Sequence, residues 1–215
     1  MRAAIELADQ HGLEGLSTRA IADRLGSGPT SMYWHVPTKA DLYELMIDAV
    51  IGEIPLADSQ AADWRQEMHD LARGTLAALQ RHPWSPLLGI QPGLGPNTRR
   101  YTEFSLNVLL SAGLDIARGI GVLAIINNYT MGFALRWAAW EQLKHRSGVA
   151  GKWDEYVGHY LNQTDATDPV LASYVKSRIT LTNNENFELG LDCLLDGIAQ
   201  HLIDPTPAAD RPADT

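Results

Sequence analysis

The sequence predicts an all-α protein with a three-helix head and a larger helical body. Along most of the chain, apolar residues recur at the three- and four-residue spacing that buries one face of a helix. Proline and glycine gather between these stretches, most densely over residues 83–97, and mark where helices stop. We therefore expect a head over residues 1–52, a body over residues 53–203 and a disordered, proline-rich tail over residues 204–215.

The first two helices of the head are predicted by local signals. Residues 1–11 form an amphipathic pattern, with apolar side chains on one face. Ser17 can cap a second helix over residues 18–25 by accepting a hydrogen bond from its first turn. Gly26 follows directly and can end that helix in the left-handed region of φ.

The third helix is expected over residues 29–35, with Pro29 at the first position, where proline is tolerated. A helix this short is unstable alone, and most of its side chains can form hydrogen bonds. Such a helix is typical of a helix-turn-helix unit, whose second helix enters the DNA major groove. An ordinary helical hairpin in a bundle fits the pattern as well. Thr38 and Asp41 then form a capping box for a helix over residues 38–54, which connects the head to the body.

Three groups of residues in the head resemble the tetracycline-repressor (TetR) family of bacterial regulators. They are Thr-Arg-x-x-Ala-x-x-Leu-Gly over 18–26, Pro-Thr at 29–30, and Tyr-Trp-His-Val at 33–36 followed by Lys39. The match covers about residues 5–50 and agrees in spacing, residue type and position near the N-terminus. The resemblance implies a DNA-binding helix-turn-helix. Members of the family usually begin with several further residues, often a basic arm, ahead of the position of Met1.

Side-chain chemistry and the matching family positions assign DNA contacts to the head. Arg19 can form two hydrogen bonds with a guanine, worth about 1–3 kcal/mol of discrimination between bases. The other expected contacts are to phosphates from Thr18, Tyr33, His35 and Lys39, to base edges or thymine methyl groups from Pro29, Thr30 and Ser31, and from Ser17 at the helix cap. The tetracycline repressors have Gln at the position of Pro29, so we expect a different operator sequence.

The body is expected to contain helices over residues 64–80, 98–112, 115–146, 153–163, 169–178 and 184–202. The helices at 115–146 and 184–202 carry more apolar surface than one core requires. Packing inside one subunit uses part of that surface, and a four-helix bundle with the symmetry mates would use the rest. TetR-like proteins dimerise through the corresponding helices, and a twofold dimer reads two half-sites of a pseudo-palindromic double-stranded operator. We therefore expect a homodimer.

The helices between residues 63 and 146 are expected to enclose a pocket for a small-molecule inducer. The lining, chosen by helix face and side-chain type, comprises Trp64, Met68, Leu71, Thr75, Trp84, Tyr101, Phe104, Ser105, Asn127, Asn128, Met131 and Leu135. Asn127 and Asn128 lie among apolar neighbours and are the best candidates for the few polar groups that such pockets carry. In the alternative interpretation, the aromatic residues belong to the core and the asparagines cross-link helices.

The body also resembles the C-terminal half of the tetracycline repressors, more loosely than the head does. The matching segments include His-Pro-Trp at 82–84, residues 127–135 and residues 187–202. The magnesium ligands of those repressors are replaced, because Pro-Leu-Leu-Gly at 86–89 stands where they have a histidine and Arg136 where they have a glutamate. We expect a metal-free, cofactor-free site for a bulky, largely apolar molecule rather than for tetracycline-magnesium.

Composition narrows the class of protein. The net charge is −9, and residues 1–52 hold four basic against seven acidic side chains, which is few cations for a DNA-binding surface. Arg19, Arg24 and Lys39 nevertheless all lie in the helix-turn-helix stretch.

A single cysteine, Cys193, fits a reducing compartment. The N-terminus lacks an apolar signal core, and the uncharged run at 119–135 contains asparagines, so we expect a cytoplasmic protein with no membrane partner.

The sequence contains no motif of the common enzyme classes that we considered. The seven histidines show no His-Glu-x-x-His spacing, and no phosphate-binding glycine loop or Gly-x-Ser-x-Gly element occurs. We expect a repressor that a small ligand releases from its operator, and not an enzyme. Two alternatives remain open: an activator or ligand-independent regulator of the same fold, and a helical small-molecule-binding protein that never meets DNA.

Overall fold

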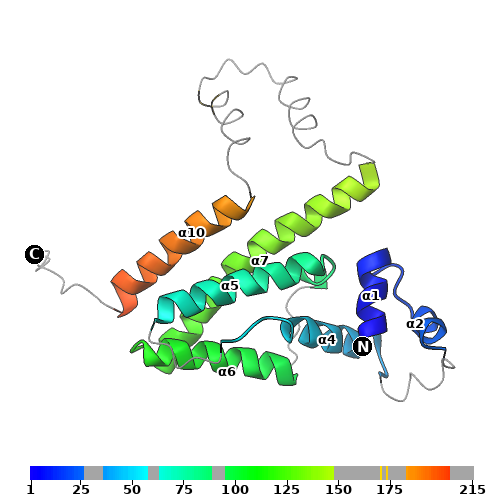
Figure 1. Ribbon diagram of the computed structural model, residues 1–215, viewed down its shortest axis with the longest axis horizontal. Coiled ribbons are helices and arrows are strands. Elements are labelled where there is room, and N and C mark those ends of the chain that lie inside the picture. Colours follow the sequence, from blue (N-terminus) through cyan, green and yellow to red (C-terminus); the bar gives the residue numbers. More distant parts are fainter. Residues whose placement is uncertain are drawn as a thin grey trace, which may run out of the picture.

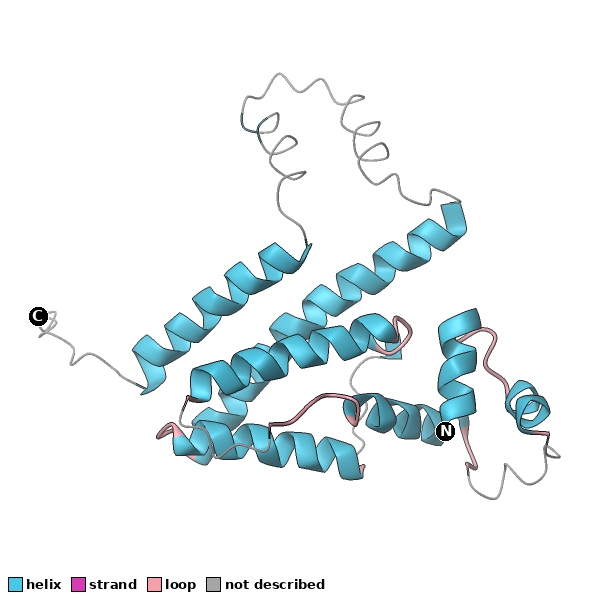
Figure 2. Cartoon of the chain, in the orientation of Figure 1, coloured by secondary structure: helices cyan, strands magenta, loops and turns pink. Residues whose placement is uncertain are grey.

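The computed structural model describes residues 1–26, 36–57, 63–88, 95–147, 170, 173 and 183–203. Within these ranges the chain forms helices and no strand, which confirms the all-α prediction (Figures 1 and 2). The elements are α1 (Arg2–His11), α2 (Thr18–Leu25), α4 (Lys39–Ile51), α5 (Trp64–Arg81), η1 (Pro86–Leu88), α6 (Pro96–Ser111), α7 (Ile116–Ser147), α10 (Asn183–Ile198) and η2 (Ala199–Ile203). The helices predicted at 29–35 and 153–163, the tail at 204–215 and most of the helix predicted at 169–178 lie outside the described residues.

The helix ends of the head follow the predicted local chemistry. The Ser17 side chain accepts a hydrogen bond from Ala20 N at 3.1 Å and caps α2. Gly26 ends α2 with φ 63°, a conformation that glycine adopts without a Cβ penalty. Thr38 and Asp41 form the reciprocal capping box at the start of α4. These predictions are confirmed.

The body is organised around α7, the longest described helix. It packs against α5, α6, α10 and the short 3-10 turn η1 (Figure 1). At the contact between α7 and α10, Tyr129 stacks on Phe187 and Phe133 meets the same ring edge-on. The Tyr129 hydroxyl donates to the Phe187 carbonyl at 2.8 Å. A Cβ at Gly190 would overlap this tyrosine hydroxyl, so α10 approaches α7 closely because residue 190 has no side chain.

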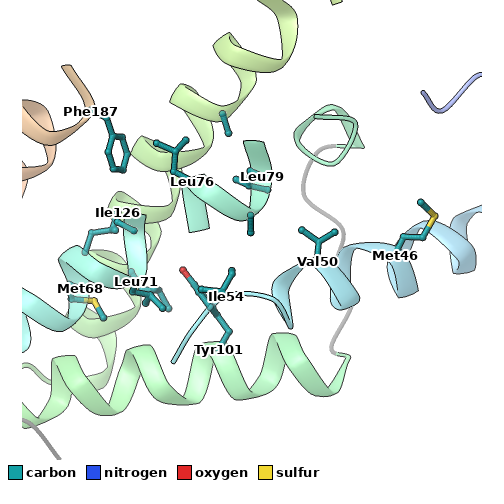
Figure 3. Packing of buried hydrophobic residues seen from close by; sticks show 14 of the residues in the cluster. Met46, Val50, Ile54, Met68, Leu71, Leu76, Leu79, Tyr101, Ile126 and Phe187 are labelled. Atoms are coloured by element: carbon teal, nitrogen blue, oxygen red, sulfur yellow. The ribbon is translucent and has the colours of Figure 1, made fainter. Parts of the chain in front are cut away.

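One hydrophobic core continues from the head into the body. Met46 and Val50 of α4 are almost fully buried, and so is Ile54 just beyond that helix. Figure 3 shows these residues leading to Leu71 of α5 and Tyr101 of α6. Because the head and the body share a core, a shift of the body helices bears directly on α4.

Three helix boundaries differ from the prediction by two residues or more. Helix α6 begins at Pro96 rather than at residue 98, because the first turn of a helix has unpaired N–H groups and tolerates proline there. Helix α4 ends at Ile51 and a turn replaces its expected last residues. The helix predicted at 184–202 changes to a π-helical turn after Ile198.

Within the described ranges, no single helix has both the length and the apolar character needed to cross a membrane. Helix α6 and the first part of α7 meet that criterion only together, as a pair bent by 119° at the break between them.

Candidate functional site

The start of α2 carries three of the predicted DNA-contacting residues. Ser17 is occupied as the helix cap, and Thr18 is half-buried beside it. The Arg19 side chain is 88% exposed, and its Nε lies 4.0 Å from the Asp23 carboxylate. An ion pair this long and this exposed holds the guanidinium only weakly, so Arg19 can turn towards a base or phosphate at little cost.

The other basic residues of the helix-turn-helix stretch have different surroundings. Arg24 donates to the Glu6 carboxylate at 2.7 Å and to the Gln10 side chain at 3.2 Å, and thereby ties α2 to α1. Lys39 is exposed at the start of α4, with Nζ 5.5 Å from the centre of the Tyr43 ring. The predicted contacts Pro29, Thr30, Ser31, Tyr33 and His35 lie outside the described residues.

Three of the predicted pocket residues meet in a chain of hydrogen bonds between three helices. The Tyr101 hydroxyl, on α6, donates to the Asn127 side-chain oxygen of α7 at 2.9 Å. The Thr75 hydroxyl of α5 lies 3.3 Å from the Tyr101 hydroxyl, and its single proton can be donated either to Tyr101 or to the Leu71 carbonyl, 2.8 Å away. Burial raises the pKa of the Tyr101 hydroxyl, against the opposing effect of the Thr75 hydrogen bond. Tyr101 therefore remains a neutral donor at physiological pH.

The remaining predicted pocket residues divide into a buried group and an exposed group. Met68, Leu71 and Ser105 are buried, and Trp64, Phe104 and Met131 are partly buried; Asn128 and Leu135 are exposed. Asn127 and Asn128 therefore point in different directions, because neighbouring residues on a helix are rotated by about 100°. The Ser105 hydroxyl donates to its own helix at the Tyr101 carbonyl, at 2.7 Å. Among the described residues, no group of three or more His, Cys, Asp or Glu side chains is arranged to hold a metal ion.

Trp84 lies away from the hydrogen-bonded group of Thr75, Tyr101 and Asn127, at the junction between head and body. Its indole N–H donates to the Asp9 carboxylate of α1 at 2.7 Å, and the residue is only 3% exposed. It also lines a cavity of about 570 Å³ between α1, the segment after α5 and the second half of α7. The structure therefore places Trp84 near the DNA-binding head rather than beside Tyr101.

His82 connects the end of α5 to two parts of the head. Its Nδ1 lies 2.8 Å from Asp9 of α1, and its Nε2 lies 3.2 Å from the carboxylate of Glu53, just after α4. Arg81 also donates to Glu53, at 2.9 Å. Burial alone would raise the pKa of Glu53, but the hydrogen bonds from Arg81 and His82 outweigh it and leave that pKa below its usual value.

Asp48 of α4 supplies the cap for helix α6. Its carboxylate accepts hydrogen bonds from the backbone N–H and hydroxyl of Thr98, both at 2.9 Å, and from the Asn97 side chain at 3.1 Å. The N-cap residue of α6 is Gly95, which offers no side chain of its own, and a Cβ there would overlap the Asp48 carboxylate. A carboxylate at a helix N-terminus also interacts favourably with the helix dipole. Asp48 therefore joins the helix that leaves the head to the helix that carries Tyr101.

From the sequence alone, none of these contacts is assigned to Asp9, Asp48, Glu53 or His82. One signal was present: Asp48 stands among buried positions of α4, where a carboxylate requires hydrogen-bond donors. The partners themselves lie 28 to 75 residues away in sequence, so the fold had to be known to name them.

Comparison with known proteins identifies both parts of the chain. Residues 1–46 match the family described as bacterial regulatory proteins, tetR family, and residues 56–202 match the tetracyclin repressor-like C-terminal domain. The chain is 34% identical to the HTH-type transcriptional repressor DrrR1 of Streptomyces coeruleorubidus, over 92% of this chain and 75% of that protein. It is 33% identical to an HTH-type transcriptional regulator of Saccharopolyspora erythraea, over 79% of this chain and 70% of that one.

A solved structure agrees with these family matches. The TetR family protein ActR of Streptomyces coelicolor, in complex with actinorhodin, superposes with a TM-score of 0.74 and 26% identity. The alignment covers 92% of this chain and 93% of ActR. The chain belongs to the TetR family of helix-turn-helix transcriptional repressors, and it is a regulator rather than an enzyme.

Proposed function

We propose that the chain acts as a homodimer that represses transcription by binding a pseudo-palindromic operator in the cytoplasm. The head, residues 1–52, binds DNA through Arg19 and residues 29–35, with further phosphate contacts from Thr18 and Lys39. The exposure of Arg19 and the family match over residues 1–46 support this assignment. One recognition helix reads only a few base pairs, so a unique site requires two heads related by a twofold axis.

The dimer interface is proposed on α7 and α10, within the predicted ranges 115–146 and 184–202. Large apolar side chains lie exposed on these helices: Ile125 is 45%, Leu135 39% and Leu189 59% exposed. Gly121 and Gly132 of α7 have open space where a Cβ would stand, so a second helix could approach that face closely. A Leu189→Glu variant should sediment as a monomer in analytical ultracentrifugation, and an unchanged dimer would move the interface elsewhere.

The body, residues 53–203, is proposed to bind a bulky, largely apolar molecule near the chain Thr75–Tyr101–Asn127. Thr75, Tyr101 and Asn127 form a polar group of three buried or half-buried side chains inside an apolar cluster. A few polar groups in apolar surroundings are the usual composition of a small-molecule site. ActR, 26% identical and solved with actinorhodin, supports a ligand held by the body.

The release mechanism rests on one observation, the capping of α6 by Asp48 of α4. A ligand at Tyr101 that shifts α6 would shift the start of that helix, and Asp48 with it. Changing operator occupancy from 99:1 to 1:99 needs about 5.5 kcal/mol, whereas typical couplings are about 1–3 kcal/mol. Two ligands acting on a symmetric dimer together supply about 2–6 kcal/mol, which reaches the required value at its upper end.

A selection from random DNA duplexes with the purified full-length chain tests the proposal. We expect it to enrich a palindrome, and Arg19→Ala to weaken binding to that palindrome by about 1–3 kcal/mol. The matched control is Arg100→Ala, on α6 and outside the head. If no palindrome is enriched, the chain is a helical small-molecule-binding protein. A reporter fused to the operator would distinguish an activator, because its output would rise with the protein.

A further inference from the structure

A line of exposed residues runs along α7 on the side turned away from its neighbours in the body. A helix rotates by about 100° per residue, so residues three and four apart share a face. Val122, Ile126 and Thr130 are buried on one face of α7, and the opposite face is exposed. The residues along the middle of the exposed face, here called the α7 row, are Ala117, Gly121, Ala124, Asn128, Gly132, Leu135 and Ala139. The row spans about 33 Å of the helix.

The α7 row is uncharged, and most of its side chains are small. Five of its seven members are alanine or glycine, so the backbone of a second helix can come close. A Cβ at Gly121 or Gly132 would meet nothing within 4 Å, so no close contact in the described part of the chain requires a glycine there. Ile120 and Ile125 flank the row and are 55% and 45% exposed. Small residues between large apolar ones form a shallow surface that suits a helix.

The spacing of the α7 row is the same when it is read from either end. The steps from Ala117 to Asn128 are four, three and four residues, and so are the steps from Asn128 to Ala139. A twofold axis perpendicular to α7 at residue 128 therefore places the row on its own copy, with residue 121 opposite 135 and residue 124 opposite 132. Each of these pairs contains a glycine, so two large side chains never oppose one another there.

Asn128, at the centre of the row, carries a group that can pair with a copy of itself. The residue is exposed and has no hydrogen-bond partner among the described residues. A carboxamide both donates and accepts, so two copies related by a twofold axis can exchange N–H···O bonds. Any other alignment of the two rows would bury each amide against apolar side chains without a partner, which is unfavourable. A single asparagine in an apolar helix interface can fix the alignment of two helices in this way.

We propose that α7 crosses the α7 of a second copy at Asn128, and that this asparagine fixes the alignment of the two subunits. This alignment rests on the homodimer proposed above and places Asn128 on its twofold axis. Helix α10 packs beside α7 (Figure 1) and carries Leu189, which is 59% exposed, so the two pairs of helices form a four-helix bundle. The alignment sets the distance between the two heads, and hence the spacing of the half-sites that they reach.

Cysteine crosslinking of the full-length protein locates the axis. Cys193, the only native cysteine, is first replaced by serine. A disulfide requires Cα atoms within about 7 Å, so a single cysteine links to its own copy only near the axis. On mild oxidation we expect Asn128→Cys to form a linked dimer at least about tenfold faster than Gly121→Cys or Leu135→Cys, whose copies lie about 21 Å apart along the helix. The double variant Gly121→Cys/Leu135→Cys should link at least about tenfold faster than either single variant, because each cysteine then faces the other.

Asn128→Asp tests the amide pair without a cysteine. Two carboxylates at the axis repel one another, so the dimer should dissociate at a concentration at least about tenfold higher, measured by analytical ultracentrifugation of a dilution series. Asn107→Asp, the same change on the exposed surface of α6, is the matched control and should leave the dimer as in the parent. Circular dichroism shows whether each variant is folded.

The possible failures separate this alignment from the homodimer itself. A parent that dimerises while Asn128→Cys links no faster than Gly121→Cys places the axis elsewhere and leaves the homodimer standing. The alignment is also wrong if the double cysteine variant links no faster than its single variants. Equal dissociation of the Asn128→Asp and Asn107→Asp dimers would overturn the amide pair. A parent that sediments as a monomer would remove the homodimer and the alignment together.

Discussion

The imidazole Nδ1 of His82 lies 2.8 Å from the Asp9 carboxylate, and this contact joins the C-cap residue of α5 to the first helix of the head. The same Asp9 oxygen accepts the Trp84 indole N–H, and the opposite ring nitrogen of His82 faces Glu53. The head is thus held to the body at both α1 and the end of α4 through one side chain.

Replacing His82 should loosen this junction. We expect His82→Ala to lower the free energy of unfolding by about 1–3 kcal/mol, because it removes a buried side chain that contacts both Asp9 and Glu53. Urea denaturation measures the change. His201→Ala, exposed on η2, is the control and should alter stability by less than about 0.5 kcal/mol. Equal stability of the two variants would show that the junction holds without His82.

Glu53 should make stability depend on pH. Hydrogen bonds from Arg81 and His82 leave its pKa below the ordinary value of 4.5 in the folded protein. A group with a depressed folded pKa stabilises the fold above its unfolded pKa, and that stability is lost as the pH falls through the folded value. We therefore expect the parent to lose stability below about pH 4.5 more steeply than Glu53→Gln does, as measured by urea midpoints from pH 3 to 6. Parallel pH profiles would contradict this prediction.

The hydrogen bond between Tyr101 and Asn127 should appear as a coupling energy. Tyr101→Phe leaves the Asn127 oxygen without its donor, and Asn127→Leu leaves the tyrosine hydroxyl without its acceptor, so each alone should cost about 1–3 kcal/mol. The double variant should cost less than the sum by about 0.5–1.5 kcal/mol, since neither polar group is then left alone. Additive losses in urea denaturation would mean that the two groups do not act together.

The predictions from sequence succeeded where the chemistry is local. The Ser17 cap, the Thr38–Asp41 capping box and the positive φ of Gly26 all depend on residues within a turn of one another. They did not extend to the contacts between helices, since Asp48 and Thr98 are 50 residues apart and nothing in either segment identifies the other as its partner. The prediction that Asn127 and Asn128 both face one pocket conflicts with helix geometry, because the rotation of 100° per residue separates adjacent side chains.

The predictions for the pocket residues also differ in success, between residues on helices and a residue in a turn. Thr75, Tyr101 and Asn127 were selected for one pocket by helix face, and the structure brings them together. Trp84 was predicted to line the same pocket, and the structure places it beside Asp9 of the head instead. Its neighbourhood is determined by the turn after His82, which carries no periodic pattern from which a face could be inferred.

Asp48 and Gly95 should be coupled by sterics, and a mutant cycle can isolate that coupling. Asp48→Ala removes the cap of α6 and should cost about 0.5–2 kcal/mol, whereas Asp48→Asn keeps one acceptor oxygen and should cost less. Gly95 has φ −61°, which any residue adopts, so Gly95→Ala is unfavourable only because its Cβ would overlap the Asp48 carboxylate. Gly95→Ala should therefore destabilise the parent by about 1–3 kcal/mol and be nearly neutral in the Asp48→Ala background. An equal cost in both backgrounds would mean that Gly95 is required for another reason, and that α6 is not seated on α4 through this carboxylate.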